Sequence, residues 1–158
     1  MLMTTTIDSP LGALRLFARG DALTGVYLPV QAVPQATRGT LPVLERAAAQ
    51  LAAYFAGERK TFDLPLAPEG TNFQRRVWDQ LVAIPFGVTR SYGELAQALA
   101  MPAGARAVGS ANSKNPISIV VPCHRVIAGS GALTGYAGGM AAKRWLLDHE
   151  LAGLRRCA

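Results

Sequence analysis

The chain has 158 residues, half of them hydrophobic in type, so it is long enough to bury the core of one ordinary domain or of two small ones. This composition excludes an intrinsically disordered protein. Lysine and arginine number 16 against 10 aspartate and glutamate residues, and the resulting net charge of +6 makes an anion such as nucleic acid a candidate partner.

Few residues are available for disulfides or metal binding. The two cysteines, Cys123 and Cys157, are too few for a disulfide framework in a chain of this length. The two histidines, His124 and His149, stand in no CxxC or HExxH pattern, so we expect no metal site. Residues 1–10 lack a secretory signal, and no apolar stretch is long enough to cross a membrane. We therefore expect a cytoplasmic protein with no membrane partner.

The N-terminal part combines a predicted sheet with a predicted helix. Strand-forming residues alternate with turn residues over the first 28 positions, a pattern typical of an antiparallel β-meander with strands over 5–7, 13–18 and 22–28. Apolar residues then recur at helical spacing from Leu44 until Gly57. The segment 62–70 contains two prolines and a glycine and is the best candidate for a linker between two subdomains.

The second half is mainly helical. Two capping boxes, each a Ser or Thr followed three residues later by Gln or Glu, mark the starts of helices. The boxes are Thr71 with Gln74 and Ser91 with Glu94, and the helices that they open are predicted over 72–84 and 92–99.

A further helix is predicted over 105–113, after the breakers Pro102 and Gly104. Two short helices joined by such a turn are typical of a helix-turn-helix. The second helix is rich in alanine and glycine and has almost no side chains that could read base edges in a groove. It suits close approach to DNA without sequence readout, or it simply packs against its neighbours.

The run 117–121 is apolar and β-branched and predicts a buried strand that leads to Cys123. A cysteine there is either a small core residue or a nucleophile, because His124 and Arg125 would supply a base and a fixed positive charge that favour the thiolate. Successive side chains of a strand point to opposite faces, so we expect a water to bridge Cys123 and His124.

A glycine-rich stretch around Tyr136 follows, with the composition of a close-fitting or mobile loop over a site, or of a plain connector. The last helix is predicted from about residue 140 to 149. Glu150 at its end is one candidate to orient His124, among only four carboxylates in residues 71–158.

Together these motifs closely resemble the O6-alkylguanine-DNA alkyltransferases, also called methylated-DNA:protein-cysteine methyltransferases. The resemblance rests above all on ISIVVPCHRVI at 117–127 and covers the whole C-terminal half, whereas the N-terminal part matches only in layout. Other matching motifs are Asn115-Pro116, Pro85-Phe86-Gly87, Ser91-Tyr92-Gly93, Ala105 to Gly109 and Gly135 to Gly139, with helices at 73–84 and 143–150.

The resemblance implies an α+β fold with two subdomains. Residues 1–68 would form a ribonuclease-H-like antiparallel sheet with a helix. Residues 69–158 would form a mainly helical, winged-helix-like domain with the helix-turn-helix, which binds DNA and accepts the alkyl group.

The implied function is DNA repair by a methyltransferase that acts once. Cys123 would take the alkyl group from O6 of guanine in duplex DNA after base flipping, and O4-alkylthymine is a second candidate substrate. Transfer to sulfur gives a thioether, which has no route of hydrolysis, so the reaction would be irreversible and need no cofactor. His124 would act through a water as the base, Glu150 would orient it, and Asn115 would be the hinge residue that ties the recognition helix to the strand that carries the nucleophile.

The resemblance also assigns contacts to the flipped base. Tyr92 would donate to it, Tyr136 would lie in the loop that closes over it, and the carbonyl of Val121 would face its polar edge. Ala137 stands where other members often have a serine, so only its backbone N–H could contribute.

The implied partner is double-stranded DNA containing O6-alkylguanine, bound by a monomer, with cooperative binding along DNA left open. Arg106 would fill the gap left in the base stack, and minor-groove entry would suit the small residues around it. The other expected DNA contacts are Ala105, Ala107, Gly109, Ser110, Lys114 and Arg125.

Two other classes of function stay open from the residues. One is a binding protein, either a helix-turn-helix regulator or an alkyltransferase-like damage sensor, although such sensors lack a cysteine at the position of Cys123. The other is a cysteine hydrolase, which would turn over repeatedly. The charge favours a DNA partner: residues 1–70 balance to zero, whereas residues 71–158 hold 10 basic and 4 acidic residues and so carry the whole excess.

Overall fold

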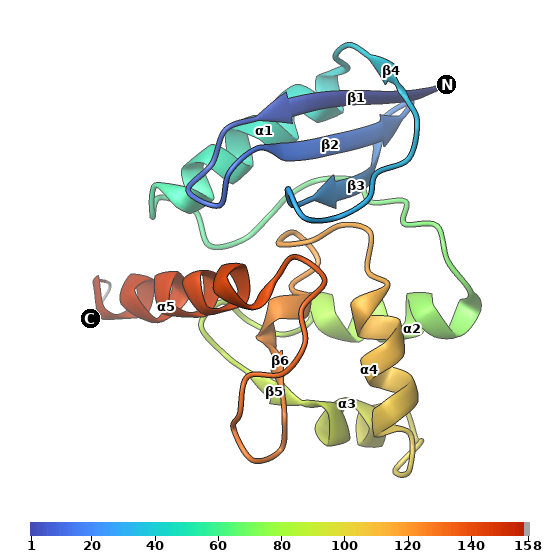
Figure 1. The fold of residues 1–158 in the computed structure, drawn as a ribbon, viewed down its shortest axis with the longest axis vertical. Helices are drawn as coiled ribbons and strands as arrows, with labels where there is room; N and C mark the ends of the chain where they lie inside the picture. The colour runs from blue at the N-terminus through green and yellow to red at the C-terminus, as the bar shows by residue number, and fades with distance from the viewer. Residues whose placement is uncertain (157–158) are drawn as a thin grey trace. The chain divides into compact units, whose positions relative to one another are not determined.

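The structure, a computed structural model, describes residues 1–156 and divides into two compact units (Figure 1). Unit 1 comprises residues 1–69 together with 116–120, and unit 2 comprises residues 70–115 together with the chain from 121 onward. The predicted single boundary between residues 68 and 69 stays a prediction, because unit 1 also includes the later segment 116–120. The expectation that Cys157 forms no disulfide concerns a residue outside the described ones.

Unit 1 is built on a four-stranded sheet in the order β3-β2-β1-β4. The predicted antiparallel meander is confirmed, because β1 pairs with β2 and β2 with β3 in antiparallel register. Strand β4 was not predicted, because it has only two residues; it runs parallel to β1. The strands are β1 (Leu2–Ile7), β2 (Leu14–Arg19), β3 (Ala22–Tyr27) and β4 (Thr37–Arg38).

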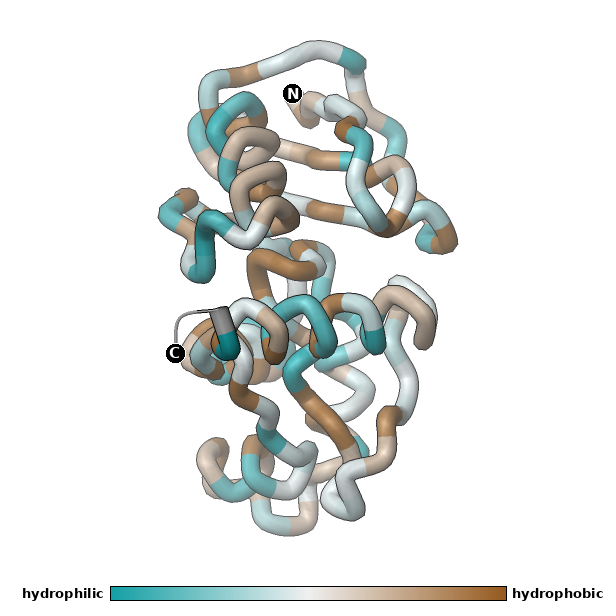
Figure 2. Tube along the Cα trace, turned by 90° about the vertical axis from the view of Figure 1, so that its left-hand side faces the viewer, coloured by the Kyte–Doolittle hydropathy of each residue, from teal (hydrophilic) through white to brown (hydrophobic). Residues whose placement is uncertain are grey.

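The predicted amphipathic helix is α1 (Pro42–Phe55), which packs on the strands of unit 1. Its spacing places Leu44, Ala47 and Leu51 on one fully buried stripe, as helical periodicity requires. Figure 2 shows hydrophobic segments on the strands and more polar ones on the outer turns of this unit.

Unit 2 contains four α-helices and a two-stranded sheet within the described residues. Both predicted capping boxes are present, with the Thr71 and Ser91 hydroxyls accepting from the backbone N–H groups of Gln74 and Glu94. The Trp78 indole donates to the carbonyl of Ala111 over 2.9 Å and ties the first of these helices to the third. The helices are α2 (Asn72–Val82), α3 (Tyr92–Ala98), α4 (Ala105–Ser113) and α5 (Met140–Arg156).

The helix-turn-helix prediction fits α3 and α4, which pack on each other and on α2. The α+β fold class is confirmed by the sheet of unit 1 and the helices of unit 2. α5 continues beyond the predicted end at residue 149, to Arg156. No helix in residues 1–156 is both long enough and apolar enough to cross a membrane.

The predicted strand over 117–121 is wrong. Ile117 forms only an isolated bridge to Val26, and Ile119 then adopts φ +74°, in the left-handed region that β-branched residues rarely enter. The N–H of Val120 bonds to the carbonyl of Ser118 over 2.8 Å and closes a tight turn. Strand propensity is overridden here because the chain must turn twice before it reaches Cys123.

The second turn is centred on Pro122, where the N–H of Cys123 bonds to the carbonyl of Val121 over 2.8 Å. Pro122 has φ −81° and ψ 65°, the values of an inverse γ-turn. The chain then forms a short 3₁₀ helix, η1 (Cys123–Arg125), and the strand β6 (Val126–Ile127), which pairs with β5 (Arg90–Ser91). Cys123 therefore lies on a helical turn in unit 2, not at the end of an extended strand.

Candidate active site

Cys123 and His124 occupy consecutive positions of η1, where the backbone turns sharply after Pro122. Cys123 is 3% exposed and His124 is fully buried. The thiol is free. The turn removes the constraint of an extended chain, whose neighbouring side chains point to opposite faces.

Glu150 on α5 is the centre of a buried network. Its Oε2 lies 2.7 Å from Nε2 of His124 and 2.9 Å from an Nη atom of Arg125, and its Oε1 accepts from Nε of Arg125 over 2.8 Å. The N–H of Gly87 also donates to Oε1 over 3.1 Å. The carboxylate, itself 1% exposed, is thus held by a bidentate guanidinium, an imidazole and a backbone amide. The predicted orienting role of Glu150 gains direct geometric support.

This network fixes the protonation states of the pair. Burial alone would raise the pKa of Glu150, but the hydrogen bonds from His124 and Arg125 outweigh it and hold that pKa far below its usual range. Burial lowers the pKa of His124 against the opposing pull of Glu150, so the imidazole is neutral near pH 7.

A carboxylate can only accept, so Nε2 of His124 carries the single proton of the neutral ring and Nδ1 is the basic nitrogen. Nδ1 is buried and has no hydrogen-bond partner among the described residues. The base that the sequence predicted therefore has a defined basic atom.

The Cys123 thiol is protonated at rest. Burial raises its pKa, and hydrogen bonding to Asn115, the charge of Lys143 and a contact from Tyr136 pull it part of the way back. Asn115 also donates from Nδ2 to the carbonyl of Val121 over 2.8 Å, so one amide joins the end of α4 to the nucleophile's turn. A thiol in this state needs a base before it can attack.

Lys143 is a buried residue of the site that the sequence motifs did not identify. Its ammonium group is fully buried on α5 and donates to the carbonyls of Val126, Thr134 and Gly135 over 2.6, 2.8 and 3.4 Å. It thus fastens the loop that carries Tyr136 beside the active-site turn. The sequence signal that could have identified Lys143 is its helical spacing. Lys143, Leu146 and Glu150 lie on one stripe of α5, and the other two are buried, so Lys143 is expected to be buried as well.

The prediction that Arg125 contacts DNA is wrong. Arg125 is 5% exposed, and its guanidinium is bonded to Glu150 and to the carbonyl of Ile84, the latter over 2.6 Å. Its charge is neutralised by the carboxylate, and Lys143 is the cation that lowers the pKa of Cys123. The side chain points inward because the buried carboxylate needs a bidentate partner.

The predicted contact of the Val121 carbonyl with a flipped base stays a prediction, and the structure gives it no support. That oxygen already accepts hydrogen bonds from Nδ2 of Asn115 and from the N–H of Cys123. Both lone pairs are therefore occupied within the protein. The carbonyl of Val121 therefore shapes the turn that carries Cys123.

The other predicted base contacts lie at the edge of unit 2. Tyr92 is half-buried at the start of α3, with its hydroxyl 3.4 Å from Oγ1 of Thr134. Tyr136 is half-buried in the loop before α5, and Ala137 beside it is exposed. The hydrogen bond to Thr134 links Tyr92 with the Tyr136 loop.

The predicted DNA-contacting residues of α4 share its outward side. Arg106, Ala107, Ser110 and Lys114 are exposed, whereas Val108, Ala111 and Asn112 are buried. Ala105 and Gly109 are half-exposed. A Cβ at Gly109 would meet the Tyr92 ring at 3.6 Å, so α3 and α4 approach each other closely at this point.

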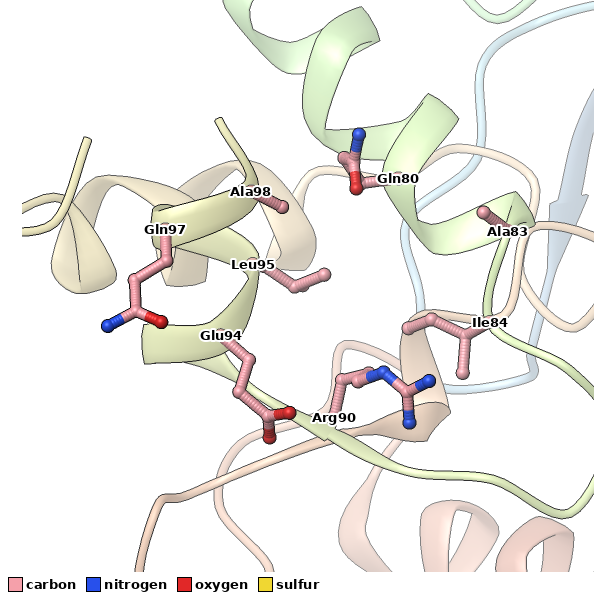
Figure 3. Close-up of a pocket in the computed structure, with 8 residues that line it drawn as sticks. All are labelled: Gln80, Ala83, Ile84, Arg90, Glu94, Leu95, Gln97 and Ala98. Carbon is pink, nitrogen blue, oxygen red and sulfur yellow. The ribbon is translucent and has the colours of Figure 1, made fainter. Parts of the chain in front are cut away.

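Unit 2 also has a pocket of about 550 Å³ outside this cluster (Figure 3). It lies between the end of α2 and α3, and none of the predicted site residues lines it. Within residues 1–156, no group of three or more His, Cys, Asp or Glu side chains could hold a metal ion. The lining residues are Gln80, Ala83, Ile84, Arg90, Glu94, Leu95, Gln97 and Ala98.

Comparison with known proteins matches both halves of the chain. The family described as 6-O-methylguanine DNA methyltransferase, DNA binding domain, matches residues 72–152, and the ribonuclease-like domain of the same family matches residues 2–68. The second match confirms the ribonuclease-like prediction for the N-terminal part.

Curated relatives carry the corresponding name. Proteins named methylated-DNA–protein-cysteine methyltransferase are 51% identical in Mycobacterium tuberculosis, over 95% of this chain and 93% of the relative, and 59% identical in Methanosarcina acetivorans, over 90% and 94%.

A crystal structure of Mycobacterium tuberculosis OGT in complex with DNA superposes with a TM-score of 0.90 at 50% identity, covering 96% of this chain and 94% of that one. With two family domains and close relatives over almost its full length, the chain belongs to the 6-O-methylguanine DNA methyltransferase family.

Proposed function

We propose that the protein repairs DNA by transferring the alkyl group of O6-alkylguanine to Sγ of Cys123. The observation that carries this proposal is the hydrogen-bond geometry of the active-site turn. A buried thiol stands next to a neutral histidine whose Nε2 proton is committed to Glu150 and whose Nδ1 is free to accept. This arrangement is suited to generating one thiolate on demand.

The reaction begins with proton transfer. The thiol proton of Cys123 passes through a water to Nδ1 of His124, and Glu150 stabilises the imidazolium that forms. Asn115 and Lys143 stabilise the thiolate, since both favour its charged form. Burial withholds solvent from the anion and leaves it a strong nucleophile.

Alkyl transfer follows in one displacement. The thiolate attacks the alkyl carbon, the S–C bond forms as the C–O6 bond breaks, and the electron pair remains on the guanine oxygen and ring. The proton held on His124 balances the charge when it returns to the guanine through solvent. The product thioether has no leaving group, so each molecule of protein reacts once.

The alkyl group lies inside the duplex, so the base must leave the stack first. We propose that Arg106 fills the gap and that the small residues of α4 allow close approach in the minor groove. The contacts around Arg106 come from Ala105, Ala107, Gly109, Ser110 and Lys114, and the flipped base is held by Tyr92, Tyr136 and the backbone of Ala137.

Several finer points belong to the same proposal. The substrate is double-stranded DNA containing O6-alkylguanine, O4-alkylthymine is a second candidate, and the protein acts as a monomer that can bind cooperatively along DNA. A cytoplasmic location stays a prediction, which cell fractionation would test.

Mass spectrometry of the intact protein tests the function. After exposure to an excess of duplex containing O6-methylguanine, we expect one added methylene mass per molecule, located on the Cys123 peptide. Cys123→Ser should bind the duplex and gain no mass, and Cys157→Ser should react like the native chain. Repeated turnover, or methyl groups on Cys157, would contradict the proposal.

A further inference from the structure

Unit 1 contains a pocket of about 370 Å³ that the alkyl transfer does not use. Three strands contribute to it. Thr4 pairs with Arg38 on β4, and Thr6 pairs with Arg15 on β2. Paired residues, and residues two apart on one strand, point to the same side of a sheet, so these four side chains share one face. The other lining residues are Thr5, Gly39 and Thr40.

The pocket holds hydrogen-bond donors that the protein itself does not satisfy. Thr4 is 2% exposed, and its hydroxyl has no partner among the described residues. Nε of Arg15 is likewise buried and unpartnered. Buried polar groups are normally hydrogen-bonded, so two such groups at one pocket indicate a ligand that supplies acceptors.

Arg15 is held in place without using its donors. Its guanidinium carbon lies 5.7 Å from the centre of the Phe17 ring, which itself packs edge-on against Tyr27 at 5.3 Å. Stacking on an aromatic face leaves the in-plane N–H groups of an arginine available. The side chain is therefore oriented in advance for an acceptor.

The charge of the pocket is entirely positive. Its described lining contains two guanidinium groups and four threonines and no carboxylate. No described acidic side chain forms an ion pair with Arg15 or Arg38, whereas Arg19 on the same strand pairs with Glu69. Unit 1 has no net charge over residues 1–70, so this local excess is a property of the pocket and not of the whole unit.

We propose that this pocket binds a phosphoryl group. Two guanidiniums match the paired oxygens of a phosphate, and the threonine hydroxyls complete its hydrogen bonds. The phosphate belongs either to a DNA backbone or to free inorganic phosphate, and the test distinguishes these sources.

The first arm uses the full-length protein and inorganic phosphate. In ¹H–¹⁵N NMR titration, we expect saturable shifts of the amides of Thr4, Thr6 and Gly39. Arg38→Gln and Arg15→Gln should each weaken this binding roughly tenfold, the usual loss for a charge-assisted hydrogen bond. Arg19→Gln is the matched control, because it removes the same charge from the same strand outside the pocket. Equal shifts with acetate, or no saturable shift, would overturn the proposal.

The second arm measures affinity for undamaged duplex DNA against salt concentration. Loss of one phosphate contact should reduce the slope of log K against log salt by about 0.9. If Arg38→Gln lowers the slope and Arg19→Gln does not, the source is the DNA backbone. If phosphate binds but the slope is unchanged, the site takes free phosphate. If neither arm responds, the proposal fails, whatever the outcome of alkyl transfer at Cys123.

Discussion

The two parts of unit 2 that serve the proposed reaction are built in opposite ways. The side chains of His124, Arg125, Lys143 and Glu150 are at most 5% exposed. Short hydrogen bonds join Glu150 to His124 and Arg125 in a buried network, and Lys143 donates to the carbonyl of Val126 beside it. The outward side of α4 is exposed and formed largely by small side chains, and its N-cap Gly104 makes no side-chain cap. Chemistry at a thiol needs fixed protonation states, whereas close approach to DNA needs small side chains. The variants below test whether the two parts are separable.

Glu150→Gln should have the largest effect. It keeps the shape of the side chain but leaves Arg125 as a buried charge without its counter-ion, and only one accepting oxygen remains for the donors of Arg125 and His124. Breaking a buried ion pair costs about 3–5 kcal/mol of unfolding free energy. Urea denaturation would measure this loss, and transfer to Cys123 should fall with it.

Asp148→Asn is the control for that change. It removes the same charge from the same helix at an exposed position, so its effect should stay within about 0.5 kcal/mol. If both variants behaved alike, the network would contribute no more than a surface charge does.

Lys143→Met should come next. Three carbonyls would lose their donor, at about 1–3 kcal/mol for a buried group left unsatisfied. Loss of the nearby cation should also raise the pKa of the Cys123 thiol. We expect roughly tenfold slower alkylation of the Cys123 peptide by iodoacetamide at neutral pH, which corresponds to about 1.4 kcal/mol.

The pH profile of that alkylation separates positioning from general destabilisation. A Lys143 that only stabilised the loop would leave the midpoint of the profile unchanged in the variant. Arg144→Met, on the exposed side of α5, should keep both the rate and the midpoint of the native protein.

Acid should weaken the buried network in a defined pH window. Burial lowers the pKa of His124, so below its unfolded value of about 6.5 the unfolded chain binds a proton that the folded chain does not. Unfolding free energy should therefore fall between pH 7 and pH 5, by up to about 1.4 kcal/mol per pH unit. Near pH 4 the unfolded chain also protonates Glu150, whose pKa is lowered in the folded protein, so the unfolding free energy falls further.

The two histidines provide the comparison for this prediction. His124→Gln should flatten the decline of unfolding free energy between pH 7 and pH 5. His149 lies at a half-buried position of α5 outside the network, so His149→Gln should show the same decline of unfolding free energy as the native protein. A native protein whose stability did not change over this range would contradict the neutral state assigned to His124.

What the sequence could predict depends on how far apart in the chain the interacting residues lie. Capping boxes and the stripe of α1 depend on residues close in sequence, so Thr71 with Gln74 and Ser91 with Glu94 identified helix starts correctly. The motif at Cys123 was also found, because its neighbours are adjacent in the chain.

What could not be predicted depends on contacts distant in sequence. The strand propensity of 117–121 is overridden by turns at Ile119 and Pro122. The inward direction of Arg125 is decided by Glu150, 25 residues away. Lys143 was missed because its partners are backbone carbonyls, so that its helical spacing with Leu146 and Glu150 was the one mark it left on the sequence.

Arg106→Ala tests the exposed α4 side and should have the smallest effect on the folded protein. With no side chain to fill the gap in the stack, reaction with duplex O6-methylguanine should fall about tenfold, since extruding a base costs a few kcal/mol. Reaction with free O6-benzylguanine, which needs no extrusion, should be unchanged. Lys114→Ala is the control. Lys114 is exposed directly after α4, so its loss should weaken the binding of damaged and of undamaged DNA by the same factor. Equal losses on duplex and free base would mean that Arg106 acts on the thiol site, and the two parts would then not be separable.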